Sequence, residues 1–246
     1  MNQVPQHRAL LGVDVVGSAQ LPGHLLNAIP GTISNLVGSA LRQSGIDPDG
    51  EVLSLESPGD GVLMVLPSGR LGAILDAAVR LDQLTVEHNR WRKPEVRLRV
   101  AVHVGPVGDD GFHRARITHT RLLDAPEFKN LLKRCHAEAT GATAEETATT
   151  ALIVSSEALD TAFSGDHTEV ARRGDFASLP VSHKEYRHDA WVRVPGFDSR
   201  SLAALADTTT APEPVARVRN VVHGNMHGVQ AGNVSGDLNF HAGRRP

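Results

Sequence analysis

The 246-residue sequence is poor in cysteine and in aromatic side chains, and each shortage excludes a class of protein. A single cysteine, Cys135, excludes an intramolecular disulfide and a cysteine-rich zinc site. Phe, Trp and Tyr make up 4% of the residues, which argues against a surface that stacks on nucleic-acid bases. Lys and Arg number 25 against 28 Asp and Glu, so the chain lacks the basic excess of a general nucleic-acid binder.

Long apolar runs are also missing from the sequence. The longest, such as residues 62–66 and 151–154, are too short to cross a bilayer. The chain starts without a cationic segment followed by an apolar one, so no secretion signal is expected. Apolar residues still make up 40% of the chain, which is enough for a core. We therefore expect a cytoplasmic protein that binds neither membranes nor nucleic acid.

Composition divides the chain into three regions. Residues 8–197 alternate apolar runs with polar turns and predict a folded domain. Residues 198–216 contain a threonine run and a Pro-Glu-Pro sequence, which predict a linker. Residues 217–246 are rich in Gly, Asn and Val and show no helical periodicity, so they predict a β-prone tail.

Apolar periodicity in the first region predicts an α+β fold, with a mostly antiparallel sheet and helices on one of its faces. A Pro-Gly-Asp-Gly sequence at 58–61 predicts a hairpin. Pro30 predicts that the first helix starts late or is kinked. The expected strands are residues 9–16, 52–55, 62–66, 96–104, 152–154, 179–181 and 190–194, and the expected helices are residues 25–41, 71–88, 118–134 and one that starts near 155.

Two carboxylates stand at positions that suit a metal site. Asp14 ends the first strand, and Asp60 lies in the hairpin between the second and third strands. If these strands are neighbours, both carboxylates meet at one edge of the sheet and suit Mg²⁺ or Mn²⁺ bound together with substrate phosphates. Taken singly, each has an ordinary structural explanation, since Asp is common in turns and caps. Their combination favours the metal site.

Six stretches, taken in order, resemble the motifs of class III nucleotidyl cyclases. The resemblance covers residues 8–197 and is nearest to the compact, stand-alone cyclase-like domains of actinobacteria. It implies a ferredoxin-like core and a catalytic domain that works as a head-to-tail homodimer. The matching stretches are residues 11–18, 59–65, 98–107, 121–126, 152–155, and 190–196 with the lysine at 184 before them.

The resemblance also implies roles for single residues. Asp14 and Asp60 of one chain would hold two Mg²⁺ or Mn²⁺ ions. Arg121 and Lys184 of the other chain would complete the site for a nucleoside triphosphate. The ribose 3′-hydroxyl would attack the α-phosphorus and release pyrophosphate, a reaction that requires positioning and charge neutralisation.

Further positions bear on the substrate. Gly17 and Ser18, at the end of the first motif, are expected to contact it. Glu56 stands where adenylyl cyclases of the family carry Lys and guanylyl cyclases carry Glu, so the resemblance favours GTP or a pyrimidine nucleotide over ATP. Ile117 stands where the family has an Asn that orients the ribose, four residues before Arg121, and its side chain cannot form that hydrogen bond.

The histidines show no zinc-ligand spacing. We expect His103 to support its strand rather than to act as an acid or base. His113, His119 and His136 are expected to be solvated.

The tail places Gly at every fourth residue, at 224, 228, 232 and 236. Val229, Gln230 and Gly232 resemble the Val-Gln-x-Gly core of amyloid signalling motifs, which implies assembly with an effector protein that carries a matching motif. A disordered Gly-rich end is the alternative.

Two functions are therefore compatible with the sequence. The chain is either a nucleotidyl cyclase, with a role in defence signalling, or a cyclase-fold adaptor that binds a nucleotide without turnover and signals through its tail. The four charged residues of the implied site favour the enzyme. Ile117 favours the adaptor.

Overall fold

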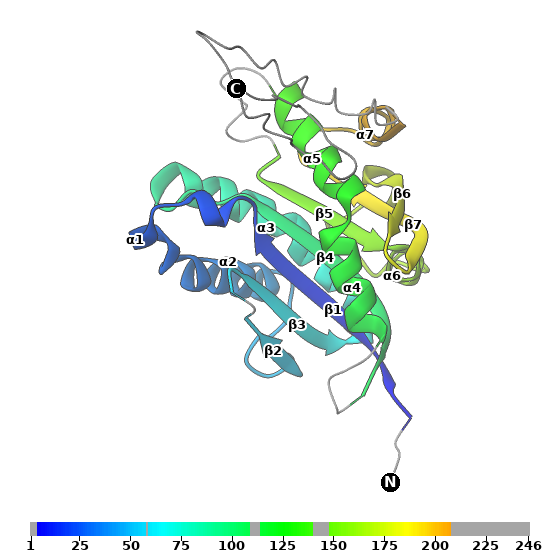
Figure 1. Cartoon of the computed structure of the whole chain (residues 1–246). Helices are drawn as coiled ribbons and strands as arrows, with labels where there is room; N and C mark the ends of the chain where they lie inside the picture. Colours follow the sequence, from blue (N-terminus) through cyan, green and yellow to red (C-terminus); the bar gives the residue numbers. More distant parts are fainter. Residues whose placement is uncertain (1–3, 58, 109–113, 140–147, 208–246) are drawn as a thin grey trace, which may run out of the picture. The chain divides into compact units, whose positions relative to one another are not determined.

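Figure 1 shows a computed structural model of the chain, which describes residues 4–57, 59–108, 114–139 and 148–207. The contacts divide the chain into two units, Met1–Asp207 and Thr208–Pro246, and the second lies outside the described residues. The first unit contains a seven-stranded sheet in the order β2-β3-β1-β4-β5-β7-β6. Its strands are β1 (Gln6–Val15), β2 (Ser54–Glu56), β3 (Gly61–Pro67), β4 (Leu98–Val107), β5 (Thr150–Ser155), β6 (Ala177–His183) and β7 (Tyr186–Arg193).

Only β4 and β5 run parallel among the neighbouring strands that the structure describes. In the described ranges, no helix is long and apolar enough to cross a membrane. The helices are α1 (Gly23–Leu26), α2 (Ile29–Gln43), α3 (Leu71–Trp91), α4 (Arg114–Asp124), α5 (Pro126–Glu138), α6 (Ser156–Ala162) and α7 (Ser199–Asp207), with short 3-10 turns at Ser18–Gln20, Ser68–Arg70 and Arg173–Asp175.

The first half of the domain forms a ferredoxin-like core. Its element order is β1-α2-β2-β3-α3-β4, and its strands lie in the order β2-β3-β1-β4. Strand β1 is therefore central, between β3 and β4, and its last residues lie beside the β2–β3 hairpin.

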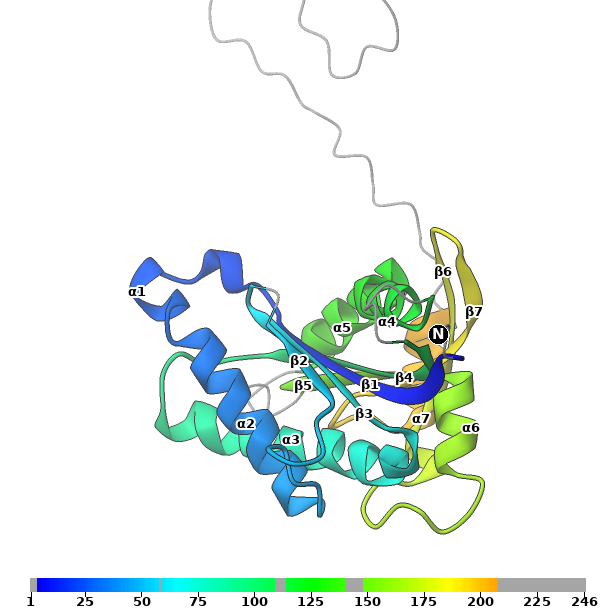
Figure 2. The ribbon, with the colours of Figure 1, turned by 90° about the horizontal axis from the view of Figure 1, so that it is seen from below.

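Helices cover both faces of the sheet. Helices α2, α3 and α6 lie on one face, and α4 and α5 lie on the other (Figure 2). Strands β1, β4 and β5 need this double cover because nearly all of their central residues are buried. The expected α+β class and the mostly antiparallel sheet are confirmed. The second helical layer is an addition to the single covered face that the sequence predicts.

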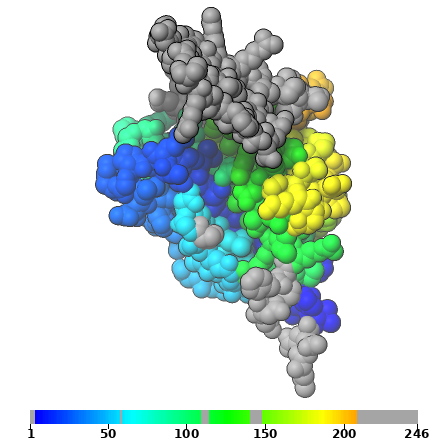
Figure 3. Space-filling model, in the orientation of Figure 1, coloured from blue at the N-terminus to red at the C-terminus, as the bar shows by residue number. Residues whose placement is uncertain are grey.

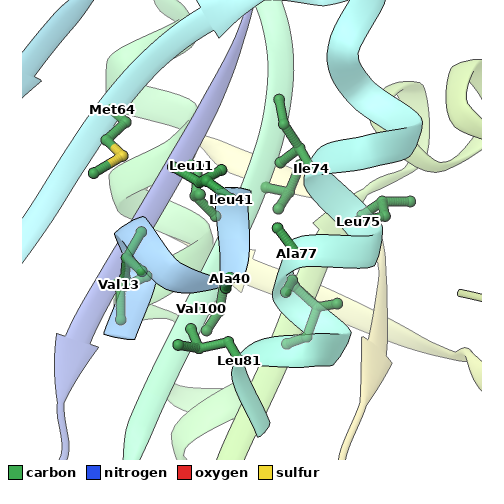
Figure 4. Packing of buried hydrophobic residues seen from close by; sticks show 14 of the residues in the cluster. Leu11, Val13, Ala40, Leu41, Met64, Ile74, Leu75, Ala77, Leu81 and Val100 are labelled. Atoms are coloured by element: carbon green, nitrogen blue, oxygen red, sulfur yellow. The ribbon is translucent and has the colours of Figure 1, made fainter. Parts of the chain in front are cut away.

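The larger hydrophobic cluster lies between the sheet and helices α2 and α3 (Figure 4). Leu11 and Val13 of β1 pack there with Val100 of β4, Leu41 of α2 and Leu81 of α3, and each is at most 2% exposed. Burial of a side chain of this kind stabilises the fold by roughly 1.5–3 kcal/mol. This packing holds the end of β1 in place.

The second cluster lies under α5 and α7. Phe128 of α5, Ile153 of β5 and Leu202 of α7 are fully buried in it. Helix α7 begins inside residues 198–216, which the sequence predicts to be a linker. Because Leu202 adds to the second cluster, Ser199–Asp207 belongs to the folded unit.

Proline positions explain where two predicted helices differ from the observed ones. The helix expected over residues 118–134 is two helices, α4 and α5, because Pro126 begins the second and disfavours helical conformation in Ala125. The late helix start predicted from Pro30 is confirmed, since α2 begins at Ile29.

Helix α4 packs closely on β1 because residue 12 is glycine. A Cβ atom on Gly12 would lie 2.1 Å from Cε1 of His119, which is buried between helix and sheet. Nε2 of His119 lies 3.1 Å from the carbonyl oxygen of Ala101 on β4. The prediction that His119 is solvated is wrong, because the helix carries it inward against the one position of β1 that leaves room for its ring.

Candidate functional site

The two predicted metal ligands lie at one edge of the sheet. Asp14 pairs with Gly61 across the antiparallel β1–β3 ladder, and Asp60 directly precedes Gly61. The Asp60 carboxylate is close enough for its charge to help raise the pKa of Asp14. Figure 3 shows the face concerned: strand β1 is recessed between the β2–β3 hairpin and helices α4 and α5.

Arg99 of β4 is the immediate partner of Asp14. The two residues face each other across the β1–β4 ladder, and Nε and Nη2 of Arg99 lie 3.0 and 2.5 Å from the two Asp14 oxygens. Both side chains are less than 20% exposed. Burial raises the pKa of Asp14 to about 6, an effect that the Arg99 guanidinium opposes and the Asp60 charge reinforces. Burial therefore destabilises the ionised form of Asp14, and a nearby cation would stabilise it.

Ser18 completes this edge. Gly17 has a left-handed backbone, with φ of 72°, so the chain turns sharply after β1 into the 3-10 turn that begins at Ser18. The Ser18 hydroxyl donates a hydrogen bond to Oδ2 of Asp60. The turn therefore fixes the Asp60 carboxylate beside Asp14.

These side chains fit a divalent cation. Two carboxylates and a hydroxyl are hard oxygen donors on rigid backbone, the set that suits Mg²⁺ or Mn²⁺. Among the described residues, no group of three or more His, Cys, Asp or Glu side chains converges. Further oxygen ligands would have to come from outside this set, as substrate phosphates do in Mg²⁺ sites of nucleotide enzymes.

Arg121 and Lys184 lie toward the β6–β7 edge of the sheet. Nε of Arg121 on α4 lies 3.1 Å from Oε1 of Glu185, and Glu185 follows Lys184 in the two-residue β6–β7 turn. Lys184 has φ of 56°, the conformation that such a tight hairpin turn imposes. The structure therefore places the helix that carries Arg121 against the turn that carries Lys184.

Ile117 lines a pocket of about 350 Å³ on this flank of α4, together with Arg121, His103 and Tyr186. Its side chain is 48% exposed. The Tyr186 hydroxyl is buried and has no hydrogen-bond partner in the described part of the chain, and His103 Nδ1 lies 2.8 Å from the Ser155 hydroxyl oxygen. The supporting role expected of His103 agrees with this contact, and burial lowers its pKa to about 4.

Glu56 lies on the opposite flank of α4. It is in edge strand β2, and its Oε1 accepts from Nη1 of Arg116. Arg116 is adjacent to Ile117 in sequence, yet the helix directs the two side chains to different flanks, toward β2 and toward β7.

Comparisons with known proteins agree with this architecture. No family model and no curated protein matches the sequence. Solved structures match: a bacterial light-regulated adenylyl cyclase has a TM-score of 0.51 and 10% identity over 82% of this chain and 57% of that one. An adenylate/guanylate cyclase/hydrolase from Silicibacter pomeroyi has a TM-score of 0.50 and 19% identity over 78% and 98%. A guanylyl cyclase has a TM-score of 0.51 and 12% identity over 80% and 95%.

The domain has the fold of adenylyl and guanylyl cyclase domains. At these identities the likeness establishes the fold, and this chain spans only 57% of the light-regulated enzyme. Evidence for an activity of this cyclase-fold domain therefore has to come from the residues of its site.

Within one chain, the predicted site residues of the cyclase-fold domain form two separate groups. Asp14, Asp60 and Ser18 lie on the β1–β3 side, whereas Arg121 lies against the β6–β7 turn. Strands β4 and β5 lie between the two sides in the sheet order. The predicted tail motif of Val229, Gln230 and Gly232 lies outside the described residues.

Sequence reasoning missed two arginines of these groups, Arg99 and Arg116. Arg99 is a polar residue inside an apolar strand, between Leu98 and Val100, and such a residue signals a charged partner across the sheet. Strand alternation could have singled it out, but only the register identifies Asp14 as its partner. Arg116 carried no comparable signal, because a charged residue on a helix is ordinarily solvated.

Proposed function

We propose that this chain is a metal-dependent nucleotidyl cyclase that converts a nucleoside triphosphate into a 3′,5′-cyclic nucleotide and pyrophosphate, with GTP or a pyrimidine nucleotide preferred over ATP. The observation that supports it most is the Asp14–Asp60 pair, built at a strand end and an adjacent hairpin of a cyclase fold. The buried position of Asp14 gives a cation at this edge more effect than it would have in water.

Asp14 and Asp60 would hold Mg²⁺ or Mn²⁺, and Ser18 would keep the Asp60 carboxylate oriented. When bound, the divalent ions supply charge neutralisation on the phosphates and lower the pKa of the attacking hydroxyl. Arg99 would keep Asp14 ionised and in place before substrate binds.

Arg121 and Lys184 would act on a substrate held by a second chain. Because the two groups are separated within one chain, a head-to-tail homodimer is the arrangement that brings them to one substrate. In that site the ribose 3′-hydroxyl would give its proton to water and its oxygen would form a bond to the α-phosphorus. The bond from that phosphorus to the bridging oxygen breaks, and pyrophosphate leaves with the electron pair. Arg121 and Lys184 would stabilise the charge that develops on the phosphate oxygens.

The second candidate function is an adaptor that binds a nucleotide without turnover. The observation that favours it is Ile117, an apolar side chain beside Arg121 at the position expected to orient the ribose. In both cases the tail residues Val229, Gln230 and Gly232 would recruit an effector with a matching motif, as part of a defence response.

Mass-spectrometric detection of cyclic product, after incubation of the full chain with each nucleoside triphosphate and Mn²⁺, tests the proposal. We expect product from the wild type and none from Asp60→Asn. Ile117→Asn provides the ribose contact and should raise turnover roughly tenfold, the size of one transition-state hydrogen bond. Nucleotide binding without product in both the wild type and Ile117→Asn would favour the adaptor.

A further inference from the structure

The Glu56–Arg116 ion pair changes the chemistry of the position expected to recognise the base. Oε1 of Glu56 accepts from Nη1 of Arg116, so the carboxylate that would accept hydrogen bonds from a base is already used within the same chain. The Arg116 side chain is 17% exposed and that of Glu56 is 50% exposed. At this position a ligand would therefore meet the N–H donors of Arg116, which the Glu56 carboxylate holds in place.

Arg116 also has an unsatisfied donor. Its Nε is buried and has no hydrogen-bond partner among the described residues. A buried donor without an acceptor is unfavourable, so a ligand acceptor that reorients the guanidinium would recover free energy. This second observation indicates that Arg116 is adapted to an acceptor that the described part of the chain does not supply.

A cavity of about 630 Å³ lies directly beside Arg116. Ser54 of β2, Val65 of β3 and Val107 of β4 line it with Arg116, and Ser54 and Val65 are partners in the β2–β3 ladder. Its volume falls within the usual range for small-ligand sites. Arg8 of β1 also lines it, and two valines beside two guanidinium groups and a hydroxyl suit a flat ring with polar edges.

We infer that Arg116, and not Glu56, is the specificity-determining residue for the nucleobase, and that it selects a base edge with two adjacent acceptors. This inference rests on the proposed function. A guanidinium donates two parallel hydrogen bonds, the arrangement that matches O6 and N7 of guanine. Cytosine offers the equivalent pair in N3 and O2. Adenine and uracil have no edge with two adjacent acceptors and leave one guanidinium donor unmatched.

Glu56 then has a different task from the one that the sequence comparison implies. It holds the guanidinium in its recognition position and neutralises its charge. Loss of Glu56 should therefore weaken discrimination among the bases less than loss of Arg116. If Glu56 alone recognised the base, loss of Glu56 would weaken discrimination more than loss of Arg116.

Calorimetric binding of the four nucleoside triphosphates to the full chain with Mn²⁺ tests the inference. Inorganic tripolyphosphate, which has no base, serves as the reference ligand. We expect the wild type to bind GTP or CTP about tenfold more tightly than ATP and UTP. Arg116→Ala should reduce this ratio to roughly threefold or less, whereas tripolyphosphate affinity should stay unchanged.

Arg116→Lys is the matched control, because it keeps the charge and loses the planar pair of donors. We expect it to lose discrimination as Arg116→Ala does. Preference for UTP in the wild type, or a ratio unchanged in Arg116→Ala, overturns the inference and leaves the proposed function intact if tripolyphosphate still binds with Mn²⁺. Preference for ATP overturns both the inference and the base preference of the proposed function. Absence of all triphosphate binding overturns both. A GTP-only or CTP-only preference lost in Arg116→Ala supports the inference and identifies the base.

Discussion

The β1–β3 side and the β6–β7 side of the sheet each pair a predicted site residue with an ion of opposite charge, but in contrasting surroundings. Asp14 and Arg99 are both less than 20% exposed and lie on adjacent strands. Arg121 is 21% exposed, whereas its partner Glu185 is 59% exposed and lies in a hairpin turn. Buried pairs are held firmly, and exposed pairs exchange partners readily. The carboxylate side is therefore the more rigid of the two, and in the proposed reaction Arg121 would exchange Glu185 for a substrate phosphate.

The largest expected effect is on cyclic-product formation, when each of the two sides is inactivated in a different chain. Asp60→Asn and Arg121→Ala should each lower cyclic-product formation at least ~100-fold, because each removes charge stabilisation from the same reaction. If the site is shared head to tail, co-expression of the two variants restores one intact site in each mixed dimer. Activity should then recover to roughly a quarter of the wild-type value. Product measured by mass spectrometry that stays at the single-variant level would contradict a two-chain site.

The ion pairs of the two sides should also differ in how much they contribute to the free energy of unfolding. Asp14→Ala leaves Arg99 charged and buried without its hydrogen-bonded carboxylate, so the free energy of unfolding should fall by about 3 kcal/mol. Glu185→Ala removes only an exposed partner and should leave unfolding close to wild type. Urea denaturation measures both. The double variant Asp14→Ala with Arg99→Met should recover part of the loss, and equal losses for Asp14→Ala and Glu185→Ala would erase the contrast.

Helix α4, which separates the two flanks, depends on residue 12. Gly12→Ala should destabilise the domain by about 1–3 kcal/mol, because the new methyl group overlaps the buried His119 ring. Thermal unfolding gives the size of the loss. Combination with His119→Ala makes room for the methyl group and should cost less than the sum of the two single changes. Simple additivity would show that the contact does not exist.

The smallest expected effect is on pH dependence. Burial lowers the pKa of His119 to about 4, below its usual 6.5. Between these values the unfolded state binds more protons than the folded state, so stability is complete above pH 6.5 and falls as pH drops toward 4. We expect His119→Gln to lose less stability than the wild type between pH 7 and pH 5, measured by urea denaturation. Identical pH profiles would show that His119 titrates normally.

Local pattern was enough for most of the secondary structure. Strand periodicity placed β1, β3 and β7, and Pro30 predicted the late start of α2, because these features depend on neighbouring residues. The break before α5 was missed although Pro126 was visible. Pro126 begins a new helix and disfavours helical conformation in the residue before it, which divides the continuous helix expected over residues 118–134.

The candidate site likewise combines features that are local in the sequence with contacts that are not. Asp14 and Asp60 could be identified from the sequence because a strand end and a tight turn are local features. The contacts that determine their chemistry are not local. Asp14 meets Arg99 across 85 residues, Glu56 meets Arg116 across 60, and Arg121 meets Glu185 across 64.

By itself, the sequence determined the class of fold, the order of the strands and the placement of the two carboxylates, since these follow from short-range periodicity and turn chemistry. Only the tertiary structure decided which cation neutralises Asp14, which flank of α4 Arg116 and Arg121 each occupy, and that His119 is buried. The reason is physical. Strand register and helix packing bring residues together across the whole domain, and a pairwise charge interaction depends on distance in space, which the spacing along the chain does not specify.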